Sequence, residues 1–168
     1  SLNGSVNFIV TITRMRAPGM TWMKLPMFVW TTYTMSFMIL LGTPILTGGM
    51  AMLLADRNLG TQFFQVQGGG DPVLWQHYFW FYSHPAVYII ILPAMGIVSE
   101  VLPVFSRRPL FGYTAMVAST IAIGILGFTT WSHHMFTVGL PTNLEAIFVF
   151  STMLIAVPTG VKVFNCVF

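Results

Sequence analysis

Long apolar runs, separated by short polar connections, form the main pattern of this 168-residue chain. The runs at 26–54, 73–104, 112–136 and 143–168 are each long enough to cross a bilayer core of roughly 30 Å, which takes about 20 helical residues. A shorter run at 1–13 is interpreted as the end of an earlier helix. The pattern predicts an all-α, polytopic transmembrane helix bundle, with residues 1–168 forming one membrane domain.

Basic residues are distributed unevenly among the connections. Lysine and arginine number three in residues 14–24, one in residues 55–72 and two in residues 105–112. Because basic residues accumulate in cytoplasmic loops, we expect the first and third of these connections on the inner side and the second on the outer side. Successive runs are therefore predicted to cross the membrane in alternating directions.

The composition supports a membrane protein. The chain is 55% hydrophobic and 7% charged, with a mean hydropathy of +0.78, which excludes an ordinary soluble domain. The formal net charge is +3, but the basic residues are spread along the chain, so we expect the lipid bilayer as a partner and no nucleic acid. Cys166 is the single cysteine and allows no internal disulfide. Ser1 at the start and an apolar run at the end suggest an internal fragment of a longer polypeptide.

Polar aromatic residues interrupt the second long run. Trp80, His84 and Tyr88 are four residues apart, so they share one face of a helix. The third run ends with His133 and His134, which would project about 100° apart on an α-helix. His84 is expected on the order of 16 Å from the outer end of its helix, and all three histidines are then in the outer half of the membrane.

These three histidines are the candidate metal site. Ionisable groups in a membrane interior usually mark sites or pathways, and imidazole suits copper, zinc, iron or nickel, so the spacing alone does not choose the metal. His77, near the outer interface, is interpreted as a hydrogen-bonded interior group. The alternative for His84, His133 and His134 is that each is also a hydrogen-bonded interior group and binds no metal.

A lysine lies inside the fourth run. Lys162 is surrounded by apolar residues, Thr159 precedes it by nearly one turn, and Ser99 follows Tyr88 by about three turns. These groups predict a polar file from the inner surface toward Tyr88, with Lys162 as a proton carrier. The alternative is that Lys162 extends its amine to the inner surface.

Taken in order, the motifs of this chain resemble subunit I of the haem-copper terminal oxidases, most closely the aa3-type cytochrome c oxidases. The resemblance covers nearly the whole chain. It would correspond to the region from the end of the fourth helix into the eighth helix of a twelve-helix subunit. The matching segments are 15–20, 56–58, 68–72, 76–77, 84–88, 111–113, 133–135 and 157–162.

The resemblance implies a function and a set of site residues. It implies reduction of dioxygen to water at a haem-copper centre, coupled to proton translocation. His84, His133 and His134 would bind one copper, and Tyr88 would be joined covalently to the ring of His84. Trp80 is a haem-pocket candidate. Ser99, Thr159 and Lys162 correspond to the lysine-containing proton channel of the family.

The remaining parts of such an enzyme are expected outside this chain. The ligands of the two haems would lie elsewhere in the subunit, and the fragment alone would be inactive. The implied partners are oxidase subunits II and III and cytochrome c, which would deliver electrons through the other subunits. The expected location is the bacterial inner membrane, with the mitochondrial inner membrane as the alternative.

Two positions depart from the family pattern. Ala86 replaces the glutamate that most relatives use in the second proton channel, and Tyr82 with Ser83 replaces an aromatic residue and glycine, as in a bacterial branch that lacks the glutamate. The hydroxyls of Tyr82 and Ser83 are therefore predicted to relay protons in place of the carboxylate. Cys166 stands where tryptophan is usual.

Two other functions fit the sequence. A quinol oxidase of the same superfamily shares the histidine and tyrosine motifs but takes electrons from a lipid-soluble donor. A proton-conducting membrane transporter would use the histidines and Lys162 without any metal. Copper and haem in the complete protein would support an oxidase, and their absence would support the transporter.

Overall fold

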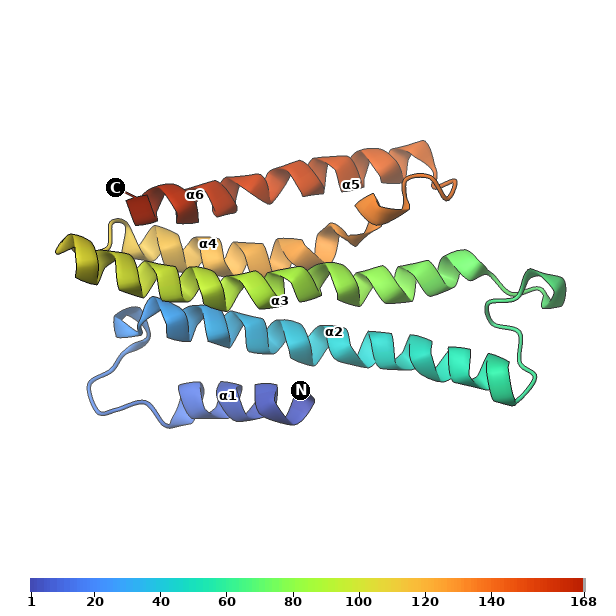
Figure 1. Cartoon of the computed structure of the whole chain (residues 1–168), viewed down its shortest axis with the longest axis horizontal. Helices are drawn as coiled ribbons and strands as arrows, with labels where there is room; N and C mark the ends of the chain where they lie inside the picture. Colours follow the sequence, from blue (N-terminus) through green and yellow to red (C-terminus); the bar gives the residue numbers. More distant parts are fainter. Residues whose placement is uncertain (168) are drawn as a thin grey trace.

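The computed structural model describes residues 1–167 and consists of helices packed side by side (Figure 1). Within these residues there is no strand. The α-helices are α1 (Leu2–Arg14), α2 (Met27–Asn58), α3 (Pro72–Ser106), α4 (Tyr113–Leu126), α5 (Thr142–Leu154) and α6 (Ala156–Val167). Short 3-10 helices are η1 (Trp22–Lys24), η2 (Val66–Gly68), η3 (Gly127–Thr129) and η4 (Trp131–Met135).

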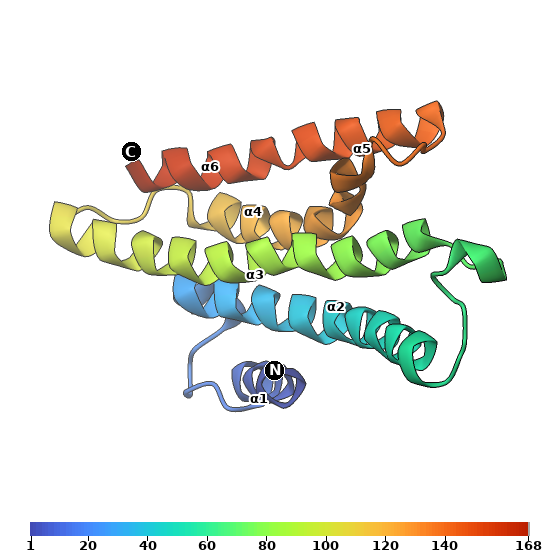
Figure 2. The same cartoon turned by 45° about the vertical axis from the view of Figure 1, so that its right-hand side comes forward.

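Four helical stretches are long and apolar enough to cross a membrane. They are Met27–Asn58, Pro72–Ser106, Tyr113–Met135 and Thr142–Val167. The predicted all-α polytopic bundle is therefore confirmed, and the chain is a multi-pass membrane protein. Helix α1 packs on α2 at one edge of the bundle (Figures 1 and 2), and α2 packs on both α3 and α4.

The connections lie alternately at the two ends of the bundle. The segments 15–26 and 107–112 are at one end, and the segments 59–71 and 136–141 are at the other (Figure 1). This is the alternation that the distribution of basic residues predicted. The end with the more basic connections is the inner side under that prediction.

Glycines allow α2 and α3 to approach closely. A Cβ added to Gly49 would lie 2.9 Å from Tyr78 Cβ, and one added to Gly96 would lie 2.2 Å from Thr31 Oγ1. Small residues are typical of helix interfaces in membranes. In apolar lipid the hydrophobic effect does not drive helices together, so they associate through the close van der Waals contact that small residues allow. This packing fixes α3, which carries His84, against its neighbour.

The third predicted run is not one continuous α-helix. Helix α4 ends at Leu126, and the chain continues through η3 and η4. Thr129 Oγ1 donates to the carbonyl of Leu126 at 2.8 Å, and Thr130 Oγ1 donates to that of Gly127 at 3.3 Å. Threonine hydroxyls that bond nearby carbonyls compete with the regular helical ladder, so the histidine-bearing segment winds more tightly than α4.

The fourth predicted run is also divided, into α5 and α6 on either side of Ile155. Pro158 has no amide hydrogen to donate to the carbonyl four residues earlier, and its ring crowds that carbonyl. The break therefore follows from the proline. The two helices continue in nearly the same direction (Figure 1), with α6 packed on α4 and α5 packed on η3 and η4.

Aspartates organise the connection between α2 and α3. Asp56 accepts hydrogen bonds from Thr61 Oγ1 at 2.6 Å and from the amides of Phe63 and Phe64, each at 2.9 Å. Asp71 caps α3 by accepting from the Val73 amide at 2.8 Å, directly before Pro72 at the first helical position. These contacts fix where α3 begins and hence the level of His84 within the bundle.

Candidate metal centre

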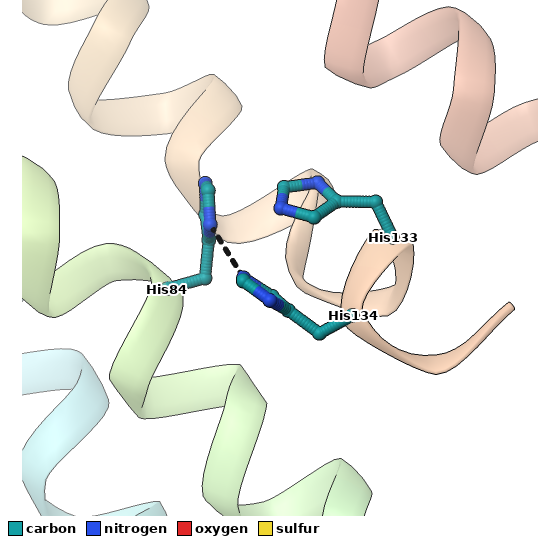
Figure 3. Close-up of side chains that lie close together, drawn as sticks. All are labelled: His84, His133 and His134. Carbon is teal, nitrogen blue, oxygen red and sulfur yellow. Dashed lines mark hydrogen bonds between the residues drawn. The ribbon is translucent and has the colours of Figure 1, made fainter.

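Three histidines from two segments point toward one another (Figure 3). His84 comes from α3, and His133 and His134 come from η4. His84 Nδ1 lies 3.2 Å from His134 Nε2, and the three side chains offer ligand nitrogens that all lie within 4.8 Å of one another. The three histidines could hold a metal ion.

The adjacent histidines do not have the angular separation expected of an α-helix. They lie on a 3-10 helix, in which successive residues are separated by about 120° because a turn contains about three residues. Their ring centroids are 4.2 Å apart, and each ring also lies near His84, with centroid distances of 4.5 Å for His133 and 5.4 Å for His134. Both rings thus lie near His84 even though a 3-10 helix separates successive side chains widely.

The histidine set fits a metal ion by its chemistry as well as its spacing. His84 is 5% exposed, and its Nε2 is buried without a hydrogen-bond partner among the described residues. Buried polar atoms are normally satisfied, so this ring has capacity for a further bond. No carboxylate or thiolate belongs to the cluster, which is therefore an imidazole-only donor set.

Trp80 and Tyr88 flank the histidines. The Trp80 indole stacks on His134, with centroids 3.8 Å apart and planes inclined by 6°. The Tyr88 ring meets His84 edge-on, with centroids 4.7 Å apart. The stripe predicted from the four-residue spacing therefore gathers at the triad, and both aromatic rings restrict how the imidazoles can turn.

Thr152 of α5 orients His133. The Thr152 hydroxyl lies 2.6 Å from the carbonyl of Phe148 and 3.0 Å from His133 Nδ1. Because the hydroxyl donates its proton to the carbonyl, Nδ1 of His133 donates to Thr152 and Nε2 is left as the acceptor. A hydrogen bond of this kind fixes the tautomer that a metal requires. The sequence contained no signal that pairs these two residues.

His77 has a specific structural partner, as its interpretation in the sequence required. Trp131 Nε1 donates to His77 Nδ1 at 3.2 Å, which connects η4 to α3 just before the histidine pair. His77 precedes His84 by seven residues, about two helical turns. This spacing was the available signal that His77 faces the same neighbour as the metal-site histidine.

Lys162 lies in the bundle interior and contacts a residue that the sequence analysis missed. Its side chain is 1% exposed, and its Nζ donates to Thr120 Oγ1 on α4 at 2.7 Å. Thr159 donates instead to the carbonyl of Ile155 at 2.8 Å. The expected alternative, extension of the amine to the inner surface, is not the arrangement in this structure.

Ser99 also has partners other than Lys162. Its hydroxyl lies 2.8 Å from the carbonyl of Met95 and 3.2 Å from Cys166 Sγ. Cys166 follows Lys162 by four residues and so lies on the same face of α6. The predicted hydroxyls and the lysine thus occupy one region without bonding directly to one another.

The predicted relay residues, Tyr82 and Ser83, directly precede the metal-site histidine on α3, about one turn before Ala86. The ring of Tyr82 lies against Gly42 of α2, where an added Cβ would be 3.1 Å from Tyr82 Cδ2. Among the described residues, the structure gives no hydrogen bond to the hydroxyl of Tyr82 or of Ser83. Both hydroxyls are therefore available to groups outside this chain or to water.

The sequence of this chain matches one family of known proteins along its whole length. The sequence model of the family described as "Cytochrome C and Quinol oxidase polypeptide I" matches residues 1–168. Cytochrome c oxidase subunit 1 of Cereibacter sphaeroides is 54% identical over 165 residues, which cover 98% of this chain and 29% of the relative. The subunit of the same name from Bacillus subtilis (strain 168) is 54% identical over 165 residues, covering 98% of this chain and 26% of the relative. The chain thus spans less than a third of either relative.

Proposed function

Because the chain belongs to the cytochrome c and quinol oxidase polypeptide I family, we propose that it is the central part of the catalytic subunit of a respiratory terminal oxidase. The proposed reaction is reduction of dioxygen to water with electrons from cytochrome c, coupled to proton translocation. The observation that carries the proposal is the convergence of His84, His133 and His134 within a membrane-spanning bundle. The rest of the subunit would supply the ligands of two haems.

His84, His133 and His134 are the proposed ligands of one copper ion. Copper accepts imidazole nitrogen, and the cluster offers nitrogens within 4.8 Å of one another, with His84 Nδ1 3.2 Å from His134 Nε2. Bound there, copper would supply one-electron redox chemistry opposite a haem. Thr152 and Trp80 would hold the imidazoles in orientation through the hydrogen bond to His133 and the stack on His134.

Tyr88 is the proposed source of a proton and an electron at the site. Its ring lies beside that of His84, with centroids 4.7 Å apart. The unsatisfied Nε2 of His84 is compatible with the covalent link between these two rings that the family resemblance implies. Trp80 is proposed to line the haem pocket as well as to stack on His134.

Two proton routes are proposed. Lys162, Ser99 and Thr159 would carry protons from the inner surface toward Tyr88, supported by the full burial of the lysine inside the bundle. Tyr82 and Ser83 would serve the route that relatives build around a glutamate, because Ala86 has no side chain able to hold a proton. The hydroxyls of both residues can donate and accept hydrogen bonds.

The proposed assembly is a multi-subunit enzyme of the bacterial inner membrane. Oxidase subunits II and III are the expected partners, dioxygen is the substrate, and the mitochondrial inner membrane is the alternative location. Residues 1–168 would form one membrane domain of that enzyme. Cytochrome c is the proposed donor because both relatives carry it in their names, and quinol is the competing donor within the family.

Purification of the complete enzyme, followed by copper and haem analysis and oxygen-consumption assays, tests this proposal. We expect two haems, copper, and turnover with reduced cytochrome c. His133→Ala should remove one copper per enzyme and abolish oxygen reduction. Met135→Leu is the matched control, since Met135 is buried on the same 3-10 helix but offers no imidazole.

Three outcomes would contradict parts of the proposal. Full turnover and full copper content in His133→Ala would remove this histidine from the ligand set. Oxidation of quinol but not cytochrome c would identify the other donor class. A complete protein with neither copper nor haem that still conducts protons would favour the metal-free transporter.

A further inference from the structure

Lys162 is held by a hydroxyl on a neighbouring helix. Its Nζ lies 2.7 Å from Thr120 Oγ1, and the two side chains are 1% and 0% exposed. Thr120 Oγ1 also lies 2.9 Å from the carbonyl of Met116, to which its hydroxyl donates. The threonine oxygen therefore accepts from the lysine, and the hydrogen bond joins α6 to α4.

Among the described residues, the only hydrogen bond of the Lys162 side chain is the one to Thr120. The hydroxyl of Thr159 is bonded to its own helix, and that of Ser99 is bonded to the carbonyl of Met95 and to Cys166. An ammonium group carries three donor hydrogens. Loss of the Thr120 oxygen would therefore leave the charged form of the lysine without any acceptor from these residues.

The same lysine also borders a pocket of about 240 Å³ between α3 and α6. Most of the residues that line this pocket are apolar, and apolar cavities normally stay dry. The hydroxyl of Thr120 on α4 is therefore the polar partner that this structure gives the amine.

The hydrogen bond to Thr120 also sets the height of the amine relative to Tyr88. Gly127, seven residues after Thr120, lies against Tyr88, since an added Cβ would be 3.1 Å from Tyr88 Cδ2. Seven residues of helix correspond to about 10 Å along the axis. A lysine bonded to Thr120 is consequently held about two turns below the tyrosine.

We propose that Thr120 is a positioning residue that keeps the Lys162 amine beside α4, about two helical turns below Tyr88, from which a proton moves on toward the histidines. This inference rests on the proposed proton role of Lys162. It assigns to Thr120 the function of holding the amine at a fixed height in the bundle.

The test uses the full-length enzyme and two substitutions of Thr120. Thr120→Val keeps the shape of the side chain and removes the oxygen, while Thr120→Ser keeps the oxygen. The rate of anaerobic reduction of the haem-copper pair is measured by stopped-flow spectroscopy, with proton uptake followed by a pH indicator. We expect Thr120→Val to slow both reduction and proton uptake about tenfold, which is the effect of losing one hydrogen bond to a charged group. Thr120→Ser should keep both rates within about twofold of those of the parent enzyme.

Ser119→Ala is the matched control. Ser119 adjoins Thr120, is 6% exposed and donates to the carbonyl of Ala115 at 2.6 Å, but it does not contact Lys162. Its removal should leave the reduction rate unchanged. Should Thr120→Val fail to assemble, Thr120→Ala removes the same oxygen without added bulk and carries the same expected slowing.

A double-mutant cycle with Lys162→Met separates this inference from the proposed function. If Thr120 acts through the lysine, Thr120→Val causes no further slowing once Lys162 is replaced. Equal slowing in both backgrounds, or a parent rate in Thr120→Val when Lys162→Met is slow, would overturn the positioning role and leave the lysine route standing. A parent rate in Lys162→Met would overturn the proposed lysine route itself.

Discussion

Trp80 and His134 form a parallel stack between α3 and η4, with ring centroids 3.8 Å apart and planes 6° apart. One ring belongs to the helix that carries His84, and the other is itself a proposed metal ligand. Stacked aromatic rings attract each other beyond the effect of simple burial. The contact therefore sets the orientation of a flexible imidazole from a rigid helix.

Replacement of Trp80 is expected to weaken metal binding. Trp80→Leu removes the stack, so His134 gains rotational freedom, and copper affinity in the complete protein should fall about tenfold, as for other groups that orient metal ligands. The measurement is copper content after dialysis against graded chelator concentrations. Trp75→Leu is the control, because Trp75 lies on α3 but packs on Phe64 and Phe79. Equal copper loss in both variants would contradict a specific role of the stack.

Replacement of Thr152 is expected to impair oxygen reduction. Thr152→Val removes the acceptor for His133 Nδ1, so the ring can adopt the tautomer that places a hydrogen on the ligand nitrogen. Turnover should fall by roughly tenfold to a hundredfold. Thr152→Ser should restore most of it. A fully active Thr152→Val enzyme, assayed by oxygen consumption, would show that another contact orients the histidine.

Two adjacent glycines of α2 should respond differently to alanine. A Cβ at Gly49 would lie 2.9 Å from Tyr78 Cβ, whereas one at Gly48 meets nothing within 4 Å. Gly49→Ala should force α2 and α3 apart at a cost of about 1–3 kcal/mol, and Gly48→Ala should be neutral or slightly stabilising. Thermal unfolding of the detergent-solubilised protein compares the two. Identical midpoints would contradict the close packing of α2 on α3.

Proton pumping is expected to depend on the hydroxyls of Tyr82 and Ser83, about one turn before Ala86. Tyr82→Phe keeps the ring that packs on Gly42 and removes only the hydroxyl. The ratio of protons pumped to electrons transferred, measured in sealed vesicles, should fall while oxygen consumption and copper content are retained. Normal ratios in both Tyr82→Phe and its double variant with Ser83→Ala would refute the relay.

The spans were predictable from sequence, but the contacts between them were not. Apolar runs define membrane helices by length. A helix surrounded by lipid is apolar on every side, however, so its pattern does not reveal which face meets a neighbour. The hydrogen bond from Lys162 to Thr120 depends on the relative level of α4 and α6, and it became apparent only in the structure.

In the candidate site, too, the residues were predictable from sequence but the local backbone geometry was not. The family resemblance named His84, His133 and His134, and the four-residue spacing placed Tyr88 and Trp80 beside His84. The tight winding of η4 arises from local competition, in which threonine hydroxyls bond to the carbonyls at the end of α4. The pattern of hydrophobic residues does not show where such side-chain hydrogen bonds form, so it could not predict the winding of η4.

The length of α3 determines what fraction of the transmembrane potential lies between the site and the inner side of the membrane. Its 35 residues, at about 1.5 Å each, extend roughly 52 Å, well beyond a hydrocarbon core of about 30 Å. If α3 is upright and centred, both its ends project from the core, and His84, twelve residues from its start, lies only about 7 Å below the outer boundary. A proton brought to the histidines from the inner side therefore crosses about three quarters of the transmembrane potential, whose full span costs about 2.3 kcal/mol per charge for each 100 mV.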